Sequence, residues 1–494
     1  MANFLTRAWA FRWIKRLFLF VLIAFACLAA VRFYDAQRKE PLSLWHTYVP
    51  QEMNAREIDH ATWEEYIANE NRVFDEVKQN VTDKLPADER VPANRYFSGS
   101  PIYPGHFRTD WNRSYTLMPQ GAPRGVAVML HGMTDAPYSL LHIAQRYQQD
   151  GFAVVAVRLP GHGTVPAGLT EVTAEDWEAA TRLAVREARR LVPAPAPLHI
   201  VGYSNGGALA LQYSLEALDD ASLPKADHLI LLSPMIGITR FARFAGLAAL
   251  PAILPAFAKA AWLDIVPEFN PFKYNSFPVN GARQSWRITS KIQREVADAA
   301  RNGKLAALPP TLTFQSVIDF TVSTSAVVGS LYSQLPANGS SEASELVLFD
   351  INRTAQWSPL LRASMREALQ RIAPAPPLRY RLTVLTNAGA TSPRVVEEST
   401  APNETTAKVE PTGLDYPPDV YSLSHVALPF PVTDSLYGRT PDPNDDFGIR
   451  LGAQSVRGET GALIAGAGLL TRLSWNPFYG YIAARIDSLA SHGP

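Results

Sequence analysis

Short runs of apolar residues alternate with segments of helical spacing through the middle of this 494-residue chain. Runs that are apolar throughout are typical of strands buried on both faces of a parallel sheet, and apolar residues three or four positions apart predict the covering helices. We predict strands at 125–130, 152–157, 198–201, 228–232, 311–314 and 345–349. We predict helices at 139–149 and 176–190 and another from residue 208. The alternation predicts an α/β fold with a mostly parallel sheet and helices on both faces.

Two long segments interrupt the alternation. Residues 238–308 separate two predicted core strands by more than one helix requires and begin with a very apolar run, so we predict a helical cap or lid there. Residues 352–418 form a second insertion, for which we predict a helix at 359–372, a strand at 379–386 and a polar tail rich in proline, threonine and glutamate.

These interruptions divide the chain into segments. The two halves of the core are predicted at 119–237 and 309–351, and residues 419–494 form a C-terminal segment. The segment 41–118 is predicted to contain a mostly helical extension at 41–95, because apolar residues between Trp63 and Val81 recur at helical spacing, followed by the entry to the core. Residues 1–40 precede this extension and contain a long uncharged apolar run.

The first 40 residues contain fifteen consecutive apolar residues, Leu17–Val31, with basic residues before them and Arg32 after them. A full membrane span needs about 20 residues, and a signal-peptide core is shorter. Because no small-residue cleavage site follows the run, we expect an uncleaved single-pass signal anchor, in the inner membrane if the cell is bacterial, with the bulk of the chain in the periplasm. A cleaved signal peptide, a buried helix and a lipoprotein acylated at Cys27 are the alternatives, and Phe25 disfavours the last because a small residue is needed there.

Charge and cysteine content exclude several classes of function. Basic and acidic residues number 46 each, so no net charge attracts nucleic acid. The single cysteine excludes an intrachain disulfide framework, and the chain has no Cys/His metal spacing and no glycine-rich phosphate loop. We therefore expect no metal, no cofactor and no nucleic-acid partner.

The most informative motif is Gly202-Tyr203-Ser204-Asn205-Gly206, which directly follows a predicted buried strand. A serine at a sharp strand-to-helix turn has strained backbone angles, and the glycines allow neighbouring chains to approach. The hydroxyl then lies beside the N-terminus of the next helix, whose free amides favour a developing oxyanion. The motif predicts Ser204 as a nucleophile, although a glycine-rich turn without chemistry has the same spelling.

A serine nucleophile needs a base and an acid, which in parallel-sheet hydrolases follow in the order Ser, Asp/Glu, His. Asp319 lies just beyond the strand predicted at 311–314, and only His425 and His492 lie downstream of it. His492 is two residues from the end of the chain, so we predict His425 as the base and Asp319 as the acid. Asp350, at the end of the next strand, is the alternative acid, and Asp319 could instead cap a helix.

The oxyanion hole is expected to use two backbone N–H groups. We predict one from Asn205, the residue after the nucleophile, and one from Met133, in the turn after the strand at 125–130. His131 and His162 are on the wrong side of the nucleophile in chain order to be its base, so we expect both to brace loops beside the pocket.

Three motifs together resemble the α/β-hydrolase superfamily, in particular its monoacylglycerol lipase and carboxylesterase-like branch, often described as serine aminopeptidase or lysophospholipase. They are His131-Gly132-Met133-Thr134-Asp135, Leu159-Pro160-Gly161-His162-Gly163 and Gly202-Tyr203-Ser204-Asn205-Gly206-Gly207. The resemblance covers residues 119–237 and 309–350. It implies a serine hydrolase without a cofactor, with Ser204, His425 and an aspartate as its catalytic residues.

These observations lead us to expect an ester hydrolase that cleaves lipid-like or acyl esters through an acyl-enzyme. The apolar run that begins the predicted cap favours a lipid-like acyl chain, and the N-terminal run favours a membrane as partner. An acyltransferase and a peptidase use the same residues and remain alternatives. A catalytically silent interaction module is disfavoured by an intact Ser, Asp and His in the expected order.

Overall fold

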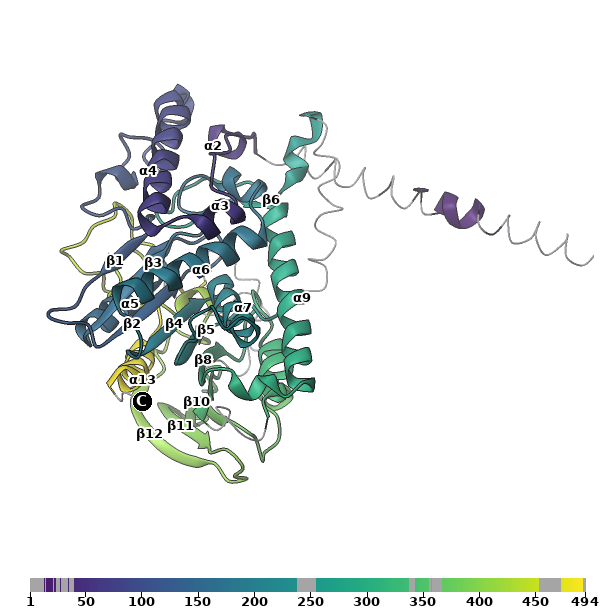
Figure 1. Ribbon diagram of the computed structural model, residues 1–494, viewed down its shortest axis with the longest axis vertical. Coiled ribbons are helices and arrows are strands. Elements are labelled where there is room, and N and C mark those ends of the chain that lie inside the picture. The colour runs from purple at the N-terminus through teal and green to yellow at the C-terminus, as the bar shows by residue number, and fades with distance from the viewer. Residues whose placement is uncertain are drawn as a thin grey trace, which may run out of the picture.

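The computed structural model describes residues 40–237, 255–336, 343–354, 357, 367–452 and 472–491, with single residues and short stretches between 13 and 34. A ten-stranded sheet runs through the molecule in the order β1-β3-β2-β4-β5-β8-β9-β10-β11-β12 (Figure 1). Its strands are β1 (Tyr115–Leu117), β2 (Gly125–Leu130), β3 (Phe152–Val157), β4 (Leu198–Tyr203), β5 (His228–Leu232), β8 (Thr311–Ser316), β9 (Glu345–Phe349), β10 (Arg381–Gly389), β11 (Ser392–Thr400) and β12 (Lys408–Asp415).

The centre of the sheet is parallel. Every neighbouring pair from β3 to β10 is parallel, while β1 and the last two strands pair antiparallel at the edges. The predicted strands are confirmed, and β4 and β8 each extend two residues further toward their carboxyl ends than their apolar runs. The predicted α/β fold with a mostly parallel sheet is therefore correct.

Side-chain alternation along each strand supplies two separate cores. Val126, Val128 and Leu130 point to one face of the sheet, and Ala127 and Met129 point to the other. Because both faces are covered, every position of these strands is apolar and buried, which explains the unbroken apolar runs of the sequence.

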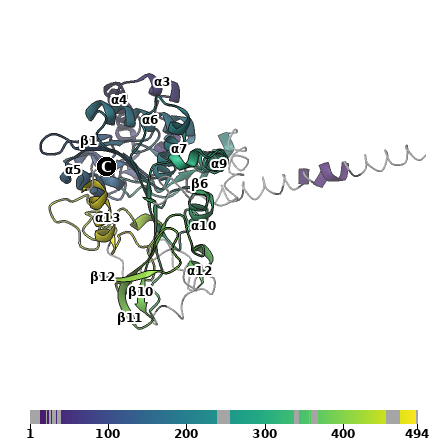
Figure 2. The same cartoon turned by 60° about the horizontal axis from the view of Figure 1, so that its bottom comes forward.

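Helices cover both faces of the sheet (Figures 1 and 2). On one face α6 and α7 pack against the central strands, and α9 packs against α7. On the other face α5 packs against β3, and α13 packs against α5. Their bounds are α5 (Leu141–Gln149), α6 (Ala174–Leu191), α7 (Asn205–Asp219), α9 (Val279–Arg301) and α13 (Tyr479–Ser491).

The range 238–308 is not a cap throughout. Residues 279–301 form α9, which lies between β5 and β8 in the chain. It packs against α6 and α7, so it belongs to the helical layer of the core on that face of the sheet. A small hairpin precedes it, β6 (Trp262–Asp264) and β7 (Phe277–Pro278). Residues 238–254, which carry most of the apolar run, lie outside the described residues.

The insertion at 352–418 extends the sheet. The predicted strand is confirmed as β10, and the polar residues after it, for which no strand was predicted, contain β11 and β12. Figure 2 shows these strands projecting beyond the helical layers. β12 is exposed along most of its length, so its residues lack the apolar signal of a core strand. Of the predicted helix at 359–372, only α12 (Ala368–Ile372) falls within the described residues.

The extension before the core is helical, as predicted. It contains α2 (Leu44–Thr47), α3 (Ala55–His60) and α4 (Trp63–Asn80), and α3 packs along α6. Thr62 begins α4 with a capping box in which its side chain accepts from the backbone N–H of Glu65.

Most of the apolar run Leu17–Val31 lies outside the described residues. Within the described part of the chain, no helix has both the length and the apolar character that a bilayer span requires.

Candidate active site

Ser204 lies in the sharp turn between β4 and α7. Its backbone angles, φ 54° and ψ −112°, are strained for a residue with a side chain. The turn is held on both sides, because the Ser204 N–H donates to the Leu232 carbonyl at 2.9 Å and the Met235 N–H donates to the Ser204 carbonyl at 2.9 Å. The predicted strained elbow is therefore present, and α7 begins at the residue after the serine.

The glycines of the motif are required by close backbone approach. A Cβ on Gly202 would lie 2.3 Å from the Gly206 carbonyl oxygen, and one on Gly206 would lie 1.9 Å from the Leu130 carbonyl oxygen. Any side chain at either position would clash with backbone. The first turn of α7 consequently packs directly on the end of β2 and on the backbone of His131.

Asp319 and His425 are brought together. His425 Nδ1 lies 2.9 Å from Asp319 Oδ2, and both side chains are almost completely buried. The other carboxylate oxygen accepts from the backbone N–H groups of Thr321 at 2.8 Å and Val322 at 2.9 Å. Burial by itself would raise the pKa of Asp319, but His425 and these N–H groups together hold that pKa below its ordinary value.

The tautomer of His425 follows from this contact. An ionised carboxylate can only accept a hydrogen bond, so Nδ1 of His425 carries the proton and Nε2 is left as a base.

Sequence reasoning missed a further donor to Asp319. Gln315, fully buried at the end of β8, donates from Nε2 to Asp319 Oδ2 at 3.1 Å and to Thr324 Oγ1 at 3.1 Å. The same carboxylate oxygen thus accepts from both Gln315 and His425. Only the position of Gln315 four residues before Asp319 hinted at this contact.

Asp350, the alternative acid, has other partners. Its carboxylate binds the Arg353 guanidinium through both oxygens, with one contact at 2.8 Å, and accepts from the Thr386 hydroxyl at 2.9 Å. The geometry therefore favours Asp319 as the partner of His425.

The segment that carries His425 is fixed to the end of the sheet. The Tyr203 hydroxyl donates to the His425 carbonyl at 3.4 Å, and the two rings lie 5.3 Å apart between centroids. Two residues earlier in this segment, the Leu423 carbonyl accepts from Ser316 Oγ at 2.8 Å. Since Tyr203 directly precedes Ser204, the histidine segment lies against the nucleophile elbow.

Met133 lies in a turn that spans residues 131–135, hereafter the 131–135 turn, which closes with a hydrogen bond from the Asp135 N–H to the Gly132 carbonyl at 3.2 Å. This turn follows β2, whose last residue contacts Gly206. Within the described part of the chain, no acceptor is recorded for the N–H of Met133 or for that of Asn205. Both predicted oxyanion donors thus flank the contact between β2 and α7.

His131 and His162 brace loops, as expected. His131 Nε2 accepts from the Leu159 N–H at 3.0 Å, and Nδ1 lies 2.9 Å from the Gly132 carbonyl oxygen. His162 contacts the Pro160 carbonyl through Nδ1 at 3.1 Å. Burial lowers the pKa of His162 to about 3 and the pKa of His131 well below its ordinary value, so both rings are neutral.

The residues after β3, hereafter the 158–164 loop, share a clamp with the 131–135 turn. Tyr274 accepts the Thr164 N–H through its hydroxyl at 2.8 Å, and its own N–H donates to the Thr134 carbonyl at 2.8 Å. Lys273 forms an ion pair with Asp135 at 2.6 Å. The segment before α9 therefore ties the two loops together.

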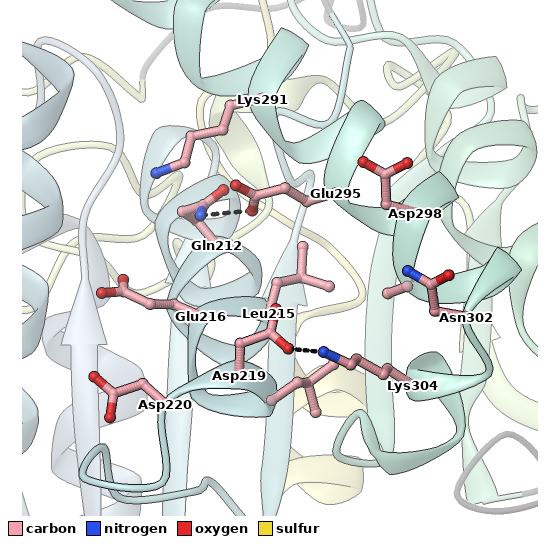
Figure 3. Close-up of a pocket in the computed structure, with 12 residues that line it drawn as sticks. Gln212, Leu215, Glu216, Asp219, Asp220, Lys291, Glu295, Asp298, Asn302 and Lys304 are labelled. Carbon is pink, nitrogen blue, oxygen red and sulfur yellow. Dashed lines mark hydrogen bonds and ion pairs between the residues drawn. The ribbon is translucent and has the colours of Figure 1, made fainter.

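A polar groove of about 480 Å³ lies between α7 and α9 (Figure 3). Its charged residues are largely paired with one another or with neighbours, as in the ion pair between Lys304 and Asp219. The groove reaches the last residues of α7, whereas Ser204 lies just before the first residue of that helix. Because the helix has 15 residues and rises about 1.5 Å per residue, the end of this groove is about 20 Å from the elbow.

Over the described ranges, no group of three or more His, Cys, Asp or Glu side chains is arranged to hold a metal ion.

Part of this chain is similar to known proteins. Residues 121–336 match the family model of serine aminopeptidase, S33. The thermostable monoacylglycerol lipase of Bacillus sp. (strain H-257) is 30% identical over 92 residues, which are 19% of this chain and 35% of the lipase. The alignment thus spans about a third of the length of this curated relative.

Solved structures of lower identity also match. A metagenome-derived lipolytic enzyme is 21% identical, with a TM-score of 0.35, over 45% of this chain and 83% of the enzyme. A monoglyceride lipase of Saccharomyces cerevisiae is 13% identical, with a TM-score of 0.36, over 45% of this chain and 78% of the lipase.

The match over residues 121–336 includes the parallel strands β2, β3, β4, β5 and β8 and the strained serine elbow. Residues 121–336, less than half of this chain, are similar to the serine aminopeptidase S33 family, and a stretch of 92 residues is similar to a monoacylglycerol lipase.

Proposed function

We propose that this protein is a serine hydrolase that cleaves carboxylic esters through an acyl-enzyme, with Ser204 as nucleophile, His425 as base and Asp319 as acid. The observation that carries the proposal is the buried contact between His425 Nδ1 and Asp319 Oδ2, at the edge of the sheet where the Ser204 elbow lies. Support also comes from the position of the His425 segment, whose backbone accepts from Tyr203, the residue before Ser204, and from the order of the three residues in the chain, which is the one that this chemistry requires.

In the first half-reaction, Ser204 Oγ attacks the carbonyl carbon of the ester while His425 Nε2 takes the hydroxyl proton. The negative charge moves to the carbonyl oxygen, where the backbone N–H groups of Asn205 and Met133 and the N-terminus of α7 stabilise it. His425 then gives its proton to the leaving alkoxide as the ester bond breaks. Asp319 stabilises the imidazolium that exists between these two transfers.

In the second half-reaction, water replaces the alcohol. His425 takes a proton from water, the hydroxyl attacks the acyl carbon, and the acid is released as the proton returns to Ser204 Oγ. The three catalytic residues thus end each cycle in their starting protonation states.

The substrate class that we propose is a lipid-like ester with an apolar acyl chain. The curated relative is a monoacylglycerol lipase, and the sequence between β5 and the α9 layer begins with a long apolar run. Activity against p-nitrophenyl esters of graded chain length tests this preference. Product analysis with added alcohols separates hydrolysis from acyl transfer.

The nucleophile is tested with a fluorophosphonate probe, which reacts with activated serines. The wild-type protein should be labelled and should hydrolyse the esters, and Ser204→Ala should do neither while keeping its circular dichroism spectrum. Ester hydrolysis that survives Ser204→Ala would refute the proposed function.

We further propose that residues 17–31 anchor the protein in a membrane, with the hydrolase domain outside the cytoplasm. Support comes from the uncharged apolar run and its basic N-terminal flank, and from Leu17–Phe20, whose side chains are more than half exposed. The protein should remain in the membrane fraction after a carbonate wash, and a reporter at its C-terminus should be active outside the cytoplasm. A mature form beginning after residue 25 would instead indicate a cleaved signal peptide.

A further inference from the structure

Arg158, the first residue of the 158–164 loop, is completely buried and is held by two carboxylates of the N-terminal extension. Glu52 binds its guanidinium through both oxygens, at 2.7 and 2.9 Å, and Glu70 accepts from Nε at 3.0 Å. Bidentate contacts of this kind fix the guanidinium in orientation as well as position. The extension therefore supplies the counter-charges for an arginine that belongs to the hydrolase core.

The extension also contacts the backbone of this loop. Glu52 Oε1 accepts the Gly161 N–H at 2.9 Å, and the Tyr66 hydroxyl donates to the Arg158 carbonyl at 2.6 Å. Within the loop, Arg158 Nη1 donates to the His162 carbonyl at 2.9 Å. Glu52 thus binds both the side chain of Arg158 and the backbone of the loop at Gly161.

The loop in turn sets the position of the 131–135 turn. The Leu159 N–H donates to His131 Nε2 at 3.0 Å, and His131 Nδ1 contacts the Gly132 carbonyl at 2.9 Å. Met133 is the next residue. Hydrogen bonds from Glu52 to Arg158, from Leu159 to His131 and from His131 to Gly132, together with the peptide bonds Arg158–Leu159 and Gly132–Met133, therefore connect Glu52 to the residue whose N–H is proposed to stabilise the oxyanion.

We infer that Glu52 is a positioning residue for the oxyanion hole, acting through Arg158 and the 158–164 loop on the 131–135 turn, so that the N-terminal extension is part of the catalytic apparatus. The inference rests on the proposed function. It concerns a residue outside the matched range 121–336 and gives the extension a role beyond connecting the N-terminal segment to the core.

The physical reason is that an oxyanion donor acts only when it is held in place before the reaction begins. Loss of the Glu52 charge leaves Arg158 with one carboxylate in place of two and weakens the acceptor of the Gly161 N–H. The loop can then shift by a fraction of an ångström, and His131 and Met133 shift with it. Such a displacement weakens binding of the transition state more than binding of the substrate.

The test compares Glu52→Gln with Glu64→Gln in the full-length protein. Glu64 is a matched control, because it also joins the extension to the core, through Arg190 at 3.3 Å, but is exposed and does not contact the 158–164 loop. For each variant we would measure kcat, KM, the melting temperature and the inhibition constant of a trifluoromethyl ketone, which forms a tetrahedral adduct with an active serine.

Glu52→Gln is expected to lower kcat by about tenfold to a hundredfold with little change in KM, and to weaken the ketone by a similar factor. Glu64→Gln should remain within about twofold of wild type in all three constants. A Glu52→Gln protein that melts at a lower temperature but keeps wild-type kcat and ketone inhibition would overturn the inference, since its role would then be purely structural.

Two further variants keep the result decisive. Glu52→Asp retains the charge but shortens the reach by one methylene, and it carries the same test if Glu52→Gln does not fold. Ser204→Ala separates this inference from the proposed function: if Ser204→Ala is inactive while the Glu52 variants are fully active, the hydrolase assignment stands and only the role of Glu52 fails.

Discussion

His425 Nδ1 lies 2.9 Å from Asp319 Oδ2, although 106 residues of sequence separate the two. The contact forms because the strands between them, β9 to β12, extend the sheet sideways and leave its carboxyl edge open. The chain then returns to that edge, where Ser316 and Tyr203 hold the backbone on either side of Ser424. The insertion at 352–418 therefore does not prevent contact between Asp319 and His425.

Replacement of the acid and the base should rank in a defined order. His425→Ala should lower kcat on the order of 10⁴-fold or more, because Ser204 then has no proton acceptor. Asp319→Asn should lower kcat by a similar or smaller factor, since an amide can hold His425 in the wrong tautomer. Asp350→Asn should change kcat little, because Asp350 pairs with Arg353. Steady-state kinetics of the three variants checks this order, and a larger loss for Asp350→Asn than for Asp319→Asn would contradict it.

Replacement of Gln315 should alter the pH profile. Gln315 and His425 donate to the same oxygen of Asp319, so Gln315→Met leaves that oxygen a stronger acceptor for the imidazole. The charged form of His425 is then favoured, and the acid limb of the kcat/KM profile should move to higher pH. The measurement is kcat/KM between pH 5 and 9 for both proteins. An unchanged midpoint would mean that Gln315 has no electrostatic effect on the pair.

Gly206→Ala should be strongly destabilising. The added Cβ would lie 1.9 Å from the Leu130 carbonyl oxygen, so α7 must move away from β2, at a cost of about 2 kcal/mol or more, and labelling of Ser204 should be lost. Gly480 is a matched control, because it also occupies the second position of a helix, α13, and a Cβ there meets nothing within 4 Å. Gly480→Ala should stabilise the protein by roughly 0.5–1 kcal/mol. Thermal unfolding compares the two, and equal effects would refute the packing argument.

The protein should lose stability as the pH falls below about 6.5. Burial lowers the pKa of His46 to about 4 and the pKa of His162 and His199 to about 3, from an ordinary value of 6.5. Below pH 6.5 the unfolded chain therefore binds protons that the folded protein excludes, and each such histidine lowers the free energy of unfolding by up to about 1.4 kcal/mol per pH unit until its folded pKa is reached.

Melting temperatures measured from pH 7 to pH 4.5 check this dependence. His46→Gln should flatten the fall, because one of the histidines that bind a proton more readily in the unfolded chain is removed. A slope that is the same for the variant and the wild type would show that His46 does not contribute. The carboxylate of Asp319 adds to the loss only at lower pH, since its folded pKa lies below its ordinary value.

The sequence alone determined those features that depend on neighbouring residues. Strands β2, β3, β5 and β9 were predicted with their observed bounds, because a strand covered on both faces must be apolar at every position. The elbow was predicted for a similar local reason. Its glycines are required because a side chain at either position would clash with backbone within a few residues of Ser204 or with the adjacent strand. The choice of Asp319 and His425 as partners of Ser204 followed from their order in the chain and from the small number of downstream histidines.

Only the tertiary structure decided which of these residues meet and what else supports them. The preference for Asp319 over Asp350 depends on Arg353, and the Gln315 contact depends on a side-chain direction that no periodicity encodes. The strands β11 and β12 escaped prediction because they are largely polar and β12 is exposed at the edge of the sheet. A helical cap was predicted where α9 lies, but its place in the layer beside α7 depends on a partner that is distant in sequence. The bond between Glu52 and Arg158 spans 106 residues. Contacts of this kind are fixed by the packing of whole layers, so a local pattern of apolar and polar positions does not contain them.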